Sequence, residues 1–218
     1  MTNQEKKQLA IAACQIRMGI IESTHGAKAG HPGGSLSSAE MFAYLYNKEL
    51  RIDPKQPKKA DRDRFVLSKG HTAPGLYSAL AYRGFFPVSD LPTLRHADSY
   101  LQGHPNMNLV PGVDMSTGSL GQGVSCAAGM AKGAKYLGQD INVYTLLGDG
   151  HDYDQIEGAF NAFRACTGKP TAILMHTTKG KGVKYMENNV DWHGKAPNDA
   201  EYEVAMNELR AAMAELEA

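Results

Sequence analysis

The 218-residue sequence lacks an excess of either charge, because 23 Lys and Arg residues balance 23 Asp and Glu residues. Nucleic-acid-binding proteins usually carry a basic excess toward the phosphate backbone, so we do not expect a nucleic-acid partner. A net charge of zero gives little repulsion between molecules, which suits a subunit of an assembly.

Long hydrophobic runs are absent as well. No apolar stretch reaches the roughly 18 residues that cross a membrane, and the first ten residues, MTNQEKKQLA, are too polar for a signal peptide. Cysteine is scarce: Cys14, Cys126 and Cys166 are odd in number and widely spaced, which fits neither a disulfide framework nor a zinc site. We therefore expect no membrane association and a cytoplasmic location.

What the sequence does contain is an alternation of strand and helix patterns. Apolar runs predict strands at 65–67, 141–147 and 171–177, and the last is apolar enough to be buried on both faces. Helical patterns cover 4–21, 38–50, 74–83, 123–136, 152–165 and 198–217, the last with Val204 and Leu209 inward. The glycine-rich segment 30–34 is not expected inside a helix, and 86–114 is expected to be mostly loop. Strand, helix and strand in succession predict an α/β fold with a mostly parallel sheet flanked by helices, in one domain over 1–218.

Histidine beside glycine is the first sign of a site. Six of the eight histidines have a glycine neighbour, which places them in loops: His25, His31, His71, His104, His151 and His193. Loops at the carboxyl ends of parallel strands form the ligand crevice of such folds, and imidazole can donate to an oxyanion or exchange protons near neutral pH. For any one of them an exposed loop position is the commoner explanation. None has the i, i+4 spacing of a helical metal pair.

Two glycine-rich turns are candidate anion sites. Gly148-Asp149-Gly150 follows a predicted strand, where glycine permits close approach of an anion and the carboxylate suits Mg²⁺ or Ca²⁺. Residues 117–123 precede a helix, whose N-terminal N–H groups bind phosphate, although they match neither a Walker loop nor the Rossmann spacing. Ordinary turns use the same residues, so both interpretations stay open.

Together, the segments resemble transketolase, in order and over nearly the whole chain. The matching motifs are Ala29-Gly30-His31-Pro32-Gly33, Ser68-Lys69-Gly70-His71, Gly103-His104-Pro105, Ser116-Thr117-Gly118-Ser119-Leu120-Gly121-Gln122-Gly123, Leu147-Gly148-Asp149-Gly150, Thr177-Thr178-Lys179-Gly180-Lys181-Gly182 and Trp192-His193-Gly194-Lys195-Ala196-Pro197. The resemblance implies a three-layer thiamine-diphosphate-binding fold and transfer of a two-carbon ketol unit from a ketose phosphate to an aldose phosphate, as in the pentose phosphate pathway.

The resemblance also implies roles for individual residues. His31, His104 and His193 match histidines that contact the sugar or the developing alkoxide. The positions that match cofactor contacts are His71, Gly118, Ser119, Leu120, Asp149, Gly150 and His193. Asp149 further matches a ligand of the divalent ion, Mg²⁺ or Ca²⁺.

Two departures from the family pattern matter. The chain ends where the family continues into a pyrimidine-binding domain, so the resemblance implies a separately encoded C-terminal partner subunit, in a homodimer or heterotetramer. Gly150 also runs directly into His151-Asp152, which resembles a much later segment, so a stretch of several tens of residues is absent at 150/151. A natural deletion, an engineered deletion and a segment omitted from the sequence all remain open.

Three functions follow from these observations. The first is the N-terminal subunit of a split transketolase that needs its partner. The second is a non-catalytic, transketolase-like scaffold that has lost cofactor binding, and the third is an enzyme of the deoxyxylulose-phosphate synthase type.

Overall fold

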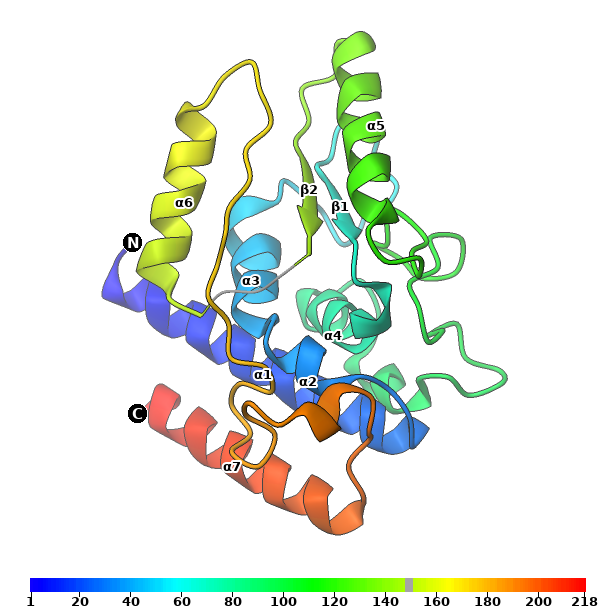
Figure 1. Cartoon of the computed structure of the whole chain (residues 1–218), viewed down its shortest axis with the longest axis vertical. Helices are drawn as coiled ribbons and strands as arrows, with labels where there is room; N and C mark the ends of the chain where they lie inside the picture. The colour runs from blue at the N-terminus through cyan, green and yellow to red at the C-terminus, as the bar shows by residue number, and fades with distance from the viewer. Residues whose placement is uncertain (148–150) are drawn as a thin grey trace.

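The fold is α/β, with a two-stranded parallel sheet enclosed by helices (Figure 1). A computed structural model describes residues 1–147 and 151–218. Strand β1 (Arg64–Leu67) pairs with β2 (Val143–Leu146) in register from Arg64 opposite Val143 to Leu67 opposite Leu146. Both strands overlap the ranges predicted from the sequence.

Seven α-helices surround this sheet in the described residues. They are α1 (Asn3–Ala27), α2 (Pro32–Leu36), α3 (Ala39–Tyr44), α4 (Ala73–Arg83), α5 (Gln122–Tyr136), α6 (Tyr153–Ala165) and α7 (Asp199–Glu217). A π-helical turn, Leu45–Glu49, continues α3, and single 3₁₀ turns occupy Gly70–Thr72, Val88–Thr93 and Val190–His193. Among the helices in these ranges, none is both long and apolar enough to cross a bilayer.

The two long terminal helices begin at capping boxes. Thr2 accepts a hydrogen bond from the Glu5 amide while the Glu5 carboxylate accepts from Thr2, and Asn198 and Glu201 repeat the arrangement at α7. Such caps satisfy amides that the first turn of a helix leaves without partners. Helix α7 then lies along α1 (Figure 1).

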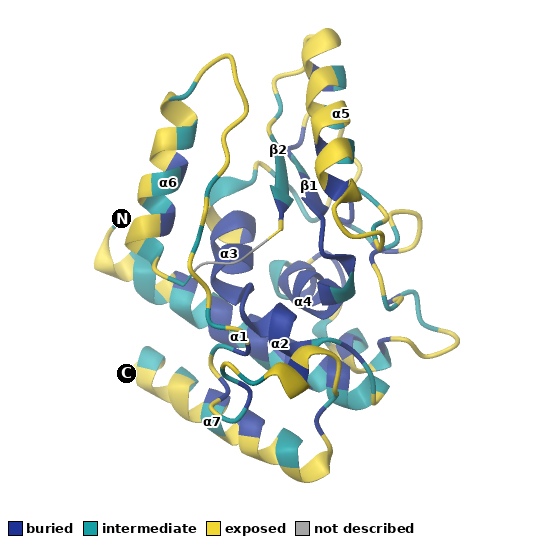
Figure 2. Ribbon diagram, in the orientation of Figure 1, coloured by how far each residue is buried: buried dark blue, intermediate teal, exposed yellow. Residues whose placement is uncertain are grey.

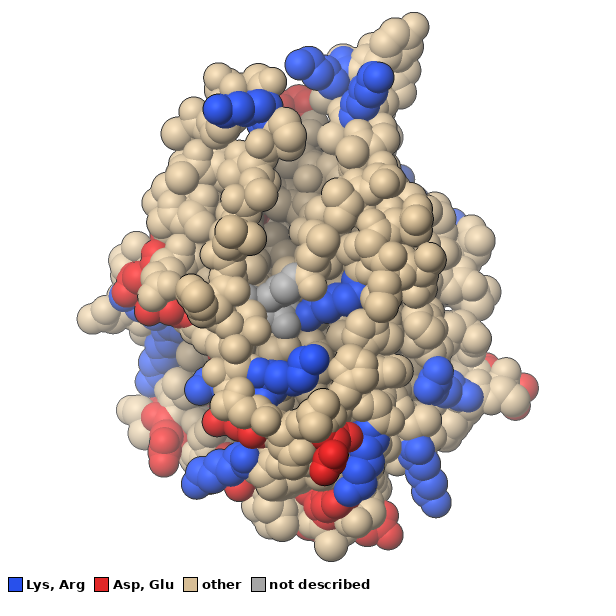
Figure 3. Space-filling model, in the orientation of Figure 1, with Lys and Arg blue, Asp and Glu red and all other residues tan. Residues whose placement is uncertain are grey.

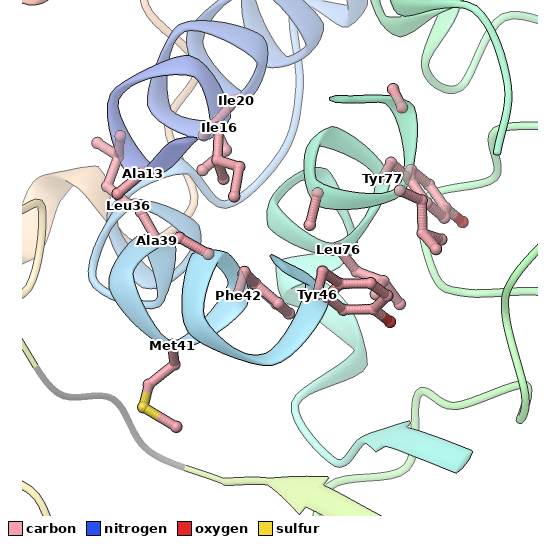
Figure 4. Close-up of a cluster of buried hydrophobic side chains, with 14 of the residues drawn as sticks. Ala13, Ile16, Ile20, Leu36, Ala39, Met41, Phe42, Tyr46, Leu76 and Tyr77 are labelled. Carbon is pink, nitrogen blue, oxygen red and sulfur yellow. The ribbon is translucent and has the colours of Figure 1, made fainter. Parts of the chain in front are cut away.

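The hydrophobic core lies between α1, α3 and α4, and Figure 4 shows its side chains converging from these helices. Ile16 and Ile20 of α1 meet Phe42 of α3 and Tyr77 of α4, and all four are fully buried. Figure 2 shows the contrast with α5 and α6, which are mostly exposed. The first half of the chain therefore carries most of the packing that supports the loops.

Three expectations about local structure were wrong. The glycine-rich segment is partly helical, because Pro32 starts α2 and Gly33 and Gly34 lie inside it. A side chain on Gly33 would begin 2.8 Å from the carbonyl oxygen of Trp192, so close packing explains this glycine. Val204 was expected to face inward but is half exposed, while Leu209 is buried as expected.

The predicted strand at 171–177 is the largest correction. This segment is extended, but within the described part of the chain it joins no strand and makes no backbone–backbone hydrogen bond. Leu174, expected to be buried on both faces, is 96% exposed. An apolar run becomes a buried strand only when a neighbouring strand pairs with it, and none of the described strands lies beside it. Figure 3 shows this face of the molecule hollowed between α5 and α6.

Candidate functional site

Three imidazole rings lie together at the centre of the candidate site. The centroid of His31 is 4.9 Å from that of His71 and 5.6 Å from that of His193, and His71 and His193 are 5.5 Å apart. The three residues are 162 positions apart in sequence at most, yet their rings form one triangle. We call these three residues the histidine cluster.

Each member of the histidine cluster stands where a regular element begins or ends. His31 is the N-cap of α2, His71 lies in the 3₁₀ turn between β1 and α4, and His193 ends the 3₁₀ turn that begins at Val190. Loops at the carboxyl end of a parallel strand commonly form the ligand crevice, and the turn that carries His71 follows β1 closely. His31 and His71 are half-buried, whereas His193 is exposed.

The cluster favours neutral imidazoles. Burial lowers the pKa of His71 to about 4, and the neighbouring His31, His193 and Lys69 act in the same direction. Burial also lowers the pKa of His31, with contributions from His193, Arg95 and His104. Neutral imidazoles can each donate one hydrogen bond and accept another, so the cluster can hold or move a proton on a bound polar group.

His104 lies at the edge of this arrangement. Its backbone carbonyl accepts a hydrogen bond of 3.0 Å from the buried Tyr77 hydroxyl, which anchors the loop to α4. A side chain placed on Gly118 would begin 3.4 Å from the His104 ring, so the ring lies against the glycine-rich loop 117–123. His104 itself is exposed, as are Ser119 and Leu120.

The glycine-rich loop and the end of β1 touch through their backbones. A Cβ atom on Gly70 would lie 2.8 Å from the Thr117 carbonyl carbon, and one on Gly123 would lie 2.7 Å from the Ser68 Cα atom. The hydroxyls of Thr117 and Ser68 are buried without a hydrogen-bond partner among the described residues. Close backbone approach and unused hydroxyl groups are features that an oxygen-rich ligand would satisfy.

A buried charged network supports the site from below, and no sequence pattern had indicated it. Arg17 donates to a Glu40 carboxylate oxygen at 2.6 Å, and Nδ1 of His151 lies 3.1 Å from the other oxygen. Burial raises the pKa of Glu40, but its hydrogen bonds and the charges of His151 and Arg17 outweigh that effect and lower it overall. Arg17 and Glu40 lie on helices without a motif, so only the fold could reveal their contact.

Two other buried or basic groups near the site also escaped notice. Lys69 is buried, and its ammonium group donates to the Ser38 hydroxyl at 2.6 Å. Arg95 has a left-handed backbone, with φ of 64°, and its charge reaches His31. The residue type of Arg95 was visible in the sequence, but its proximity to His31 was not.

Two of the glycine-flanked histidines lie outside the cluster. His25 stacks on Tyr202 with centroids 4.2 Å apart and bonds Asp199 at 2.8 Å, so it joins α1 to α7. His151 belongs to the Glu40 network. Asp149 and Gly150, expected to bind metal and diphosphate, lie outside the described residues, and no group of three or more His, Cys, Asp or Glu suited to a metal occurs elsewhere in the structure as described.

A family model described as "Transketolase, thiamine diphosphate binding domain" matches residues 7–145. Among curated relatives, one of the two subunits named for an apulose-4-phosphate transketolase in Phocaeicola vulgatus is 32% identical and aligns with 92% of this chain and 93% of its own length. The 6-deoxy-6-sulfo-D-fructose transketolase subunit SqwG of Clostridium sp. is 31% identical, with 95% and 98% covered. Human transketolase is 33% identical over 88% of this chain, which spans 41% of it.

Solved structures agree with the fold. The transketolase of Campylobacter jejuni superimposes on 99% of this chain with a TM-score of 0.83 at 24% identity, and the chain covers 46% of that protein. The transketolase of Leishmania mexicana gives a TM-score of 0.81 over the whole chain. The α/β class expected from the sequence is thus confirmed, and the chain belongs to the transketolase family as a member of its N-terminal, thiamine-diphosphate-binding domain.

Proposed function

We propose that this chain is the diphosphate-binding subunit of a split transketolase that transfers a ketol unit between sugar phosphates. The observation that carries the proposal is the histidine cluster beside the glycine-rich loop 117–123, in a chain that aligns along nearly its whole length with proteins named as transketolase subunits.

The chain's residues divide the work as follows. Bound thiamine diphosphate supplies the carbanion chemistry, and the protein orients it and supplies protons. His31, His104 and His193 contact the sugar and move protons at its oxygens, which neutral imidazoles can do. His71 and His193, with the loop residues Gly118, Ser119 and Leu120, hold the cofactor.

Asp149 would hold the divalent ion, Mg²⁺ or Ca²⁺, and Gly150 would contact the diphosphate. Carboxylate oxygen suits either ion, and an ion held by one carboxylate and phosphate oxygens keeps more water and binds more weakly than one in a full protein cage.

A partner subunit completes the site in this proposal. Large apolar side chains are exposed near the loop and along α5: Leu120 is 67% exposed, Tyr136 89% and Leu137 68%. Contiguous exposed apolar surface marks a protein interface. The partner is a separately encoded C-terminal subunit with a pyrimidine-binding domain, in a homodimer or heterotetramer in the cytoplasm, where the enzyme serves pentose phosphate chemistry.

We further propose that 1–218 is one diphosphate-binding domain that lacks a segment at 150/151. The alignment with the Phocaeicola vulgatus subunit spans 263 positions although it takes in only 92% of 218 residues, or about 200. About 60 aligned positions therefore have no counterpart in this chain. The unpaired extended segment at 171–177 supports the location of the gap, because it lies apart from the sheet that it was expected to join.

The unpaired segment also favours a second candidate function, a transketolase-like scaffold without cofactor binding. Thermal unfolding with and without Mg²⁺ and thiamine diphosphate separates the two, alone and with a pyrimidine-binding transketolase subunit from the same genome. A raised melting temperature, followed by ketol transfer from a ketose phosphate, supports the enzyme. No shift under either condition supports the scaffold, and turnover of pyruvate would indicate the deoxyxylulose-phosphate synthase type.

A further inference from the structure

His151 makes two hydrogen bonds that fix its ring in one state. Nε2 accepts the Thr178 backbone N–H at 2.8 Å, and Nδ1 lies 3.1 Å from Oε2 of Glu40. Because an amide N–H can only donate, Nε2 must present its lone pair. The ring hydrogen therefore resides on Nδ1 and is donated to the carboxylate, so a single neutral tautomer satisfies both partners.

Glu40 ties the same loop down at a second point. Its other oxygen, Oε1, accepts from Arg17 at 2.6 Å, and the Nε–H of Arg17 donates to the carbonyl of Lys181 at 2.8 Å. The side chains of Arg17 and Glu40 are only 9% and 10% exposed. One buried carboxylate thus reaches Thr178 through His151 and Lys181 through Arg17.

Between these two points the loop holds the wall of the histidine cluster. The Gly180 amide donates to the Gly33 carbonyl at 3.0 Å. Gly33 is two residues beyond His31, and it packs so closely on Trp192 that a Cβ atom would lie 2.8 Å from that carbonyl oxygen. Trp192 immediately precedes His193. Displacing the loop would therefore disturb the backbone beneath two members of the cluster.

We propose that Glu40 and His151 are positioning residues that lock residues 178–181 against α2 and thereby set the geometry of His31 and His193. Neither side chain contacts the histidine cluster in the described structure, so both act through the loop. The consequence for turnover rests on the proposed transketolase function, whereas the consequence for the loop does not.

Two variants test the locked loop in the full chain. Glu40→Gln keeps the volume and can still accept from Arg17, but its amide NH₂ faces Nδ1. The ring must then move its hydrogen to Nε2, where it opposes the Thr178 N–H. His151→Leu removes both bonds, and His151→Gln offers a donor and an acceptor again. His176→Leu is the matched control, because His176 is exposed and lies on the unpaired segment.

Hydrogen exchange by mass spectrometry gives a readout that needs no cofactor or partner. Removing a buried hydrogen bond to a charged group should speed exchange of the amides at 178–181 roughly tenfold to a hundredfold in Glu40→Gln and His151→Leu. The ring resonances of His31 and His193 should shift in the same variants. His151→Gln should restore much of the protection, and His176→Leu should match the parent chain.

Unchanged exchange and unchanged His31 and His193 resonances in a folded Glu40→Gln protein would overturn the proposal, as would equal changes in His176→Leu. If His151→Leu does not fold, Glu40→Gln decides alone. With a partner subunit present, kcat should fall at least tenfold in Glu40→Gln and recover in His151→Gln. Absence of turnover in the parent chain would count against the proposed function, and the exchange result would still stand for the loop.

Discussion

The ring of His31 meets the ring of His71 nearly edge-on, at an interplanar angle of 71° and a centroid distance of 4.9 Å. Two imidazoles this close repel each other when both are protonated. The geometry therefore requires that at least one of them stay neutral at the pH where the protein works, and the pKa of His71 is the one lowered to about 4.

Stability should consequently fall on acidification. An unfolded histidine takes up a proton near pH 6.5, while folded His71 resists until about pH 4. The unfolded state binds more protons in that window, so the contribution is full above pH 6.5 and is lost as the pH falls toward 4. We expect a decrease in unfolding free energy of about 1–2 kcal/mol after allowance for solvent screening. Urea unfolding at pH 7.5 and 4.5 measures it, and His71→Asn should show a shallower slope; an equal slope would contradict this origin.

Two glycines should respond oppositely to alanine. Gly33→Ala places a methyl group 2.8 Å from a carbonyl oxygen and should destabilise the fold by about 1–3 kcal/mol. Gly129 in α5 has open space around its Cβ position, so Gly129→Ala should stabilise the helix by about 0.5–1 kcal/mol. Chemical denaturation of both variants is the measurement. Similar effects of the two substitutions would mean that α2 is not tightly packed against Trp192.

The divalent ion should depend on one carboxylate. If Mg²⁺ and thiamine diphosphate raise the melting temperature, Asp149→Ala should abolish the metal-dependent part of the shift, because Asp149 is the one protein ligand proposed for the ion. Asp191→Ala, on an exposed turn before His193, serves as the control. An unchanged metal response in Asp149→Ala would place the ion elsewhere.

Exposed apolar side chains on the unpaired segment should promote self-association. Leu174 is 96% exposed on an extended stretch with unpaired backbone groups, and such edges recruit other strands. Leu174→Lys should shift the sedimentation profile toward smaller species at micromolar concentration. Val190→Lys, at a residue 79% exposed outside that segment, should change it less.

The junction at 150/151 has a direct test of its own. An intact mass near 23.6 kDa would support a continuous chain with Gly150 bonded to His151. A clearly heavier polypeptide would show that a further segment belongs to the protein, and 171–177 would then have a strand to pair with.

The sequence predicted best where structure depends on neighbouring residues. Asp152 and Asn198 cap α6 and α7 as the start signals indicated, because capping is decided within one turn of helix. Glycine beside histidine identified the loops of the histidine cluster, although it also pointed to His25 and His151, which bind other elements.

Prediction failed where the answer depended on distant parts of the chain. The apolar run at 171–177 has strand-like composition, yet pairing requires a neighbour that local pattern cannot supply. Gly33 sits inside a helix because Trp192 passes over it, and Trp192 is far away in sequence. The bond between Arg17 and Glu40 joins two helices, and neither residue carries a motif that would reveal it.

The contact between the glycine-rich loop and the end of β1 has a thermodynamic consequence. Gly70 meets Thr117, and Gly123 meets Ser68, with no room for a methyl group at either point. A molecule that settles on the loop must therefore also restrain the strand behind it. Occupancy should be detectable at a distance, as slower deuterium uptake by the amides of Phe65 and Val66, neither of which touches what is bound.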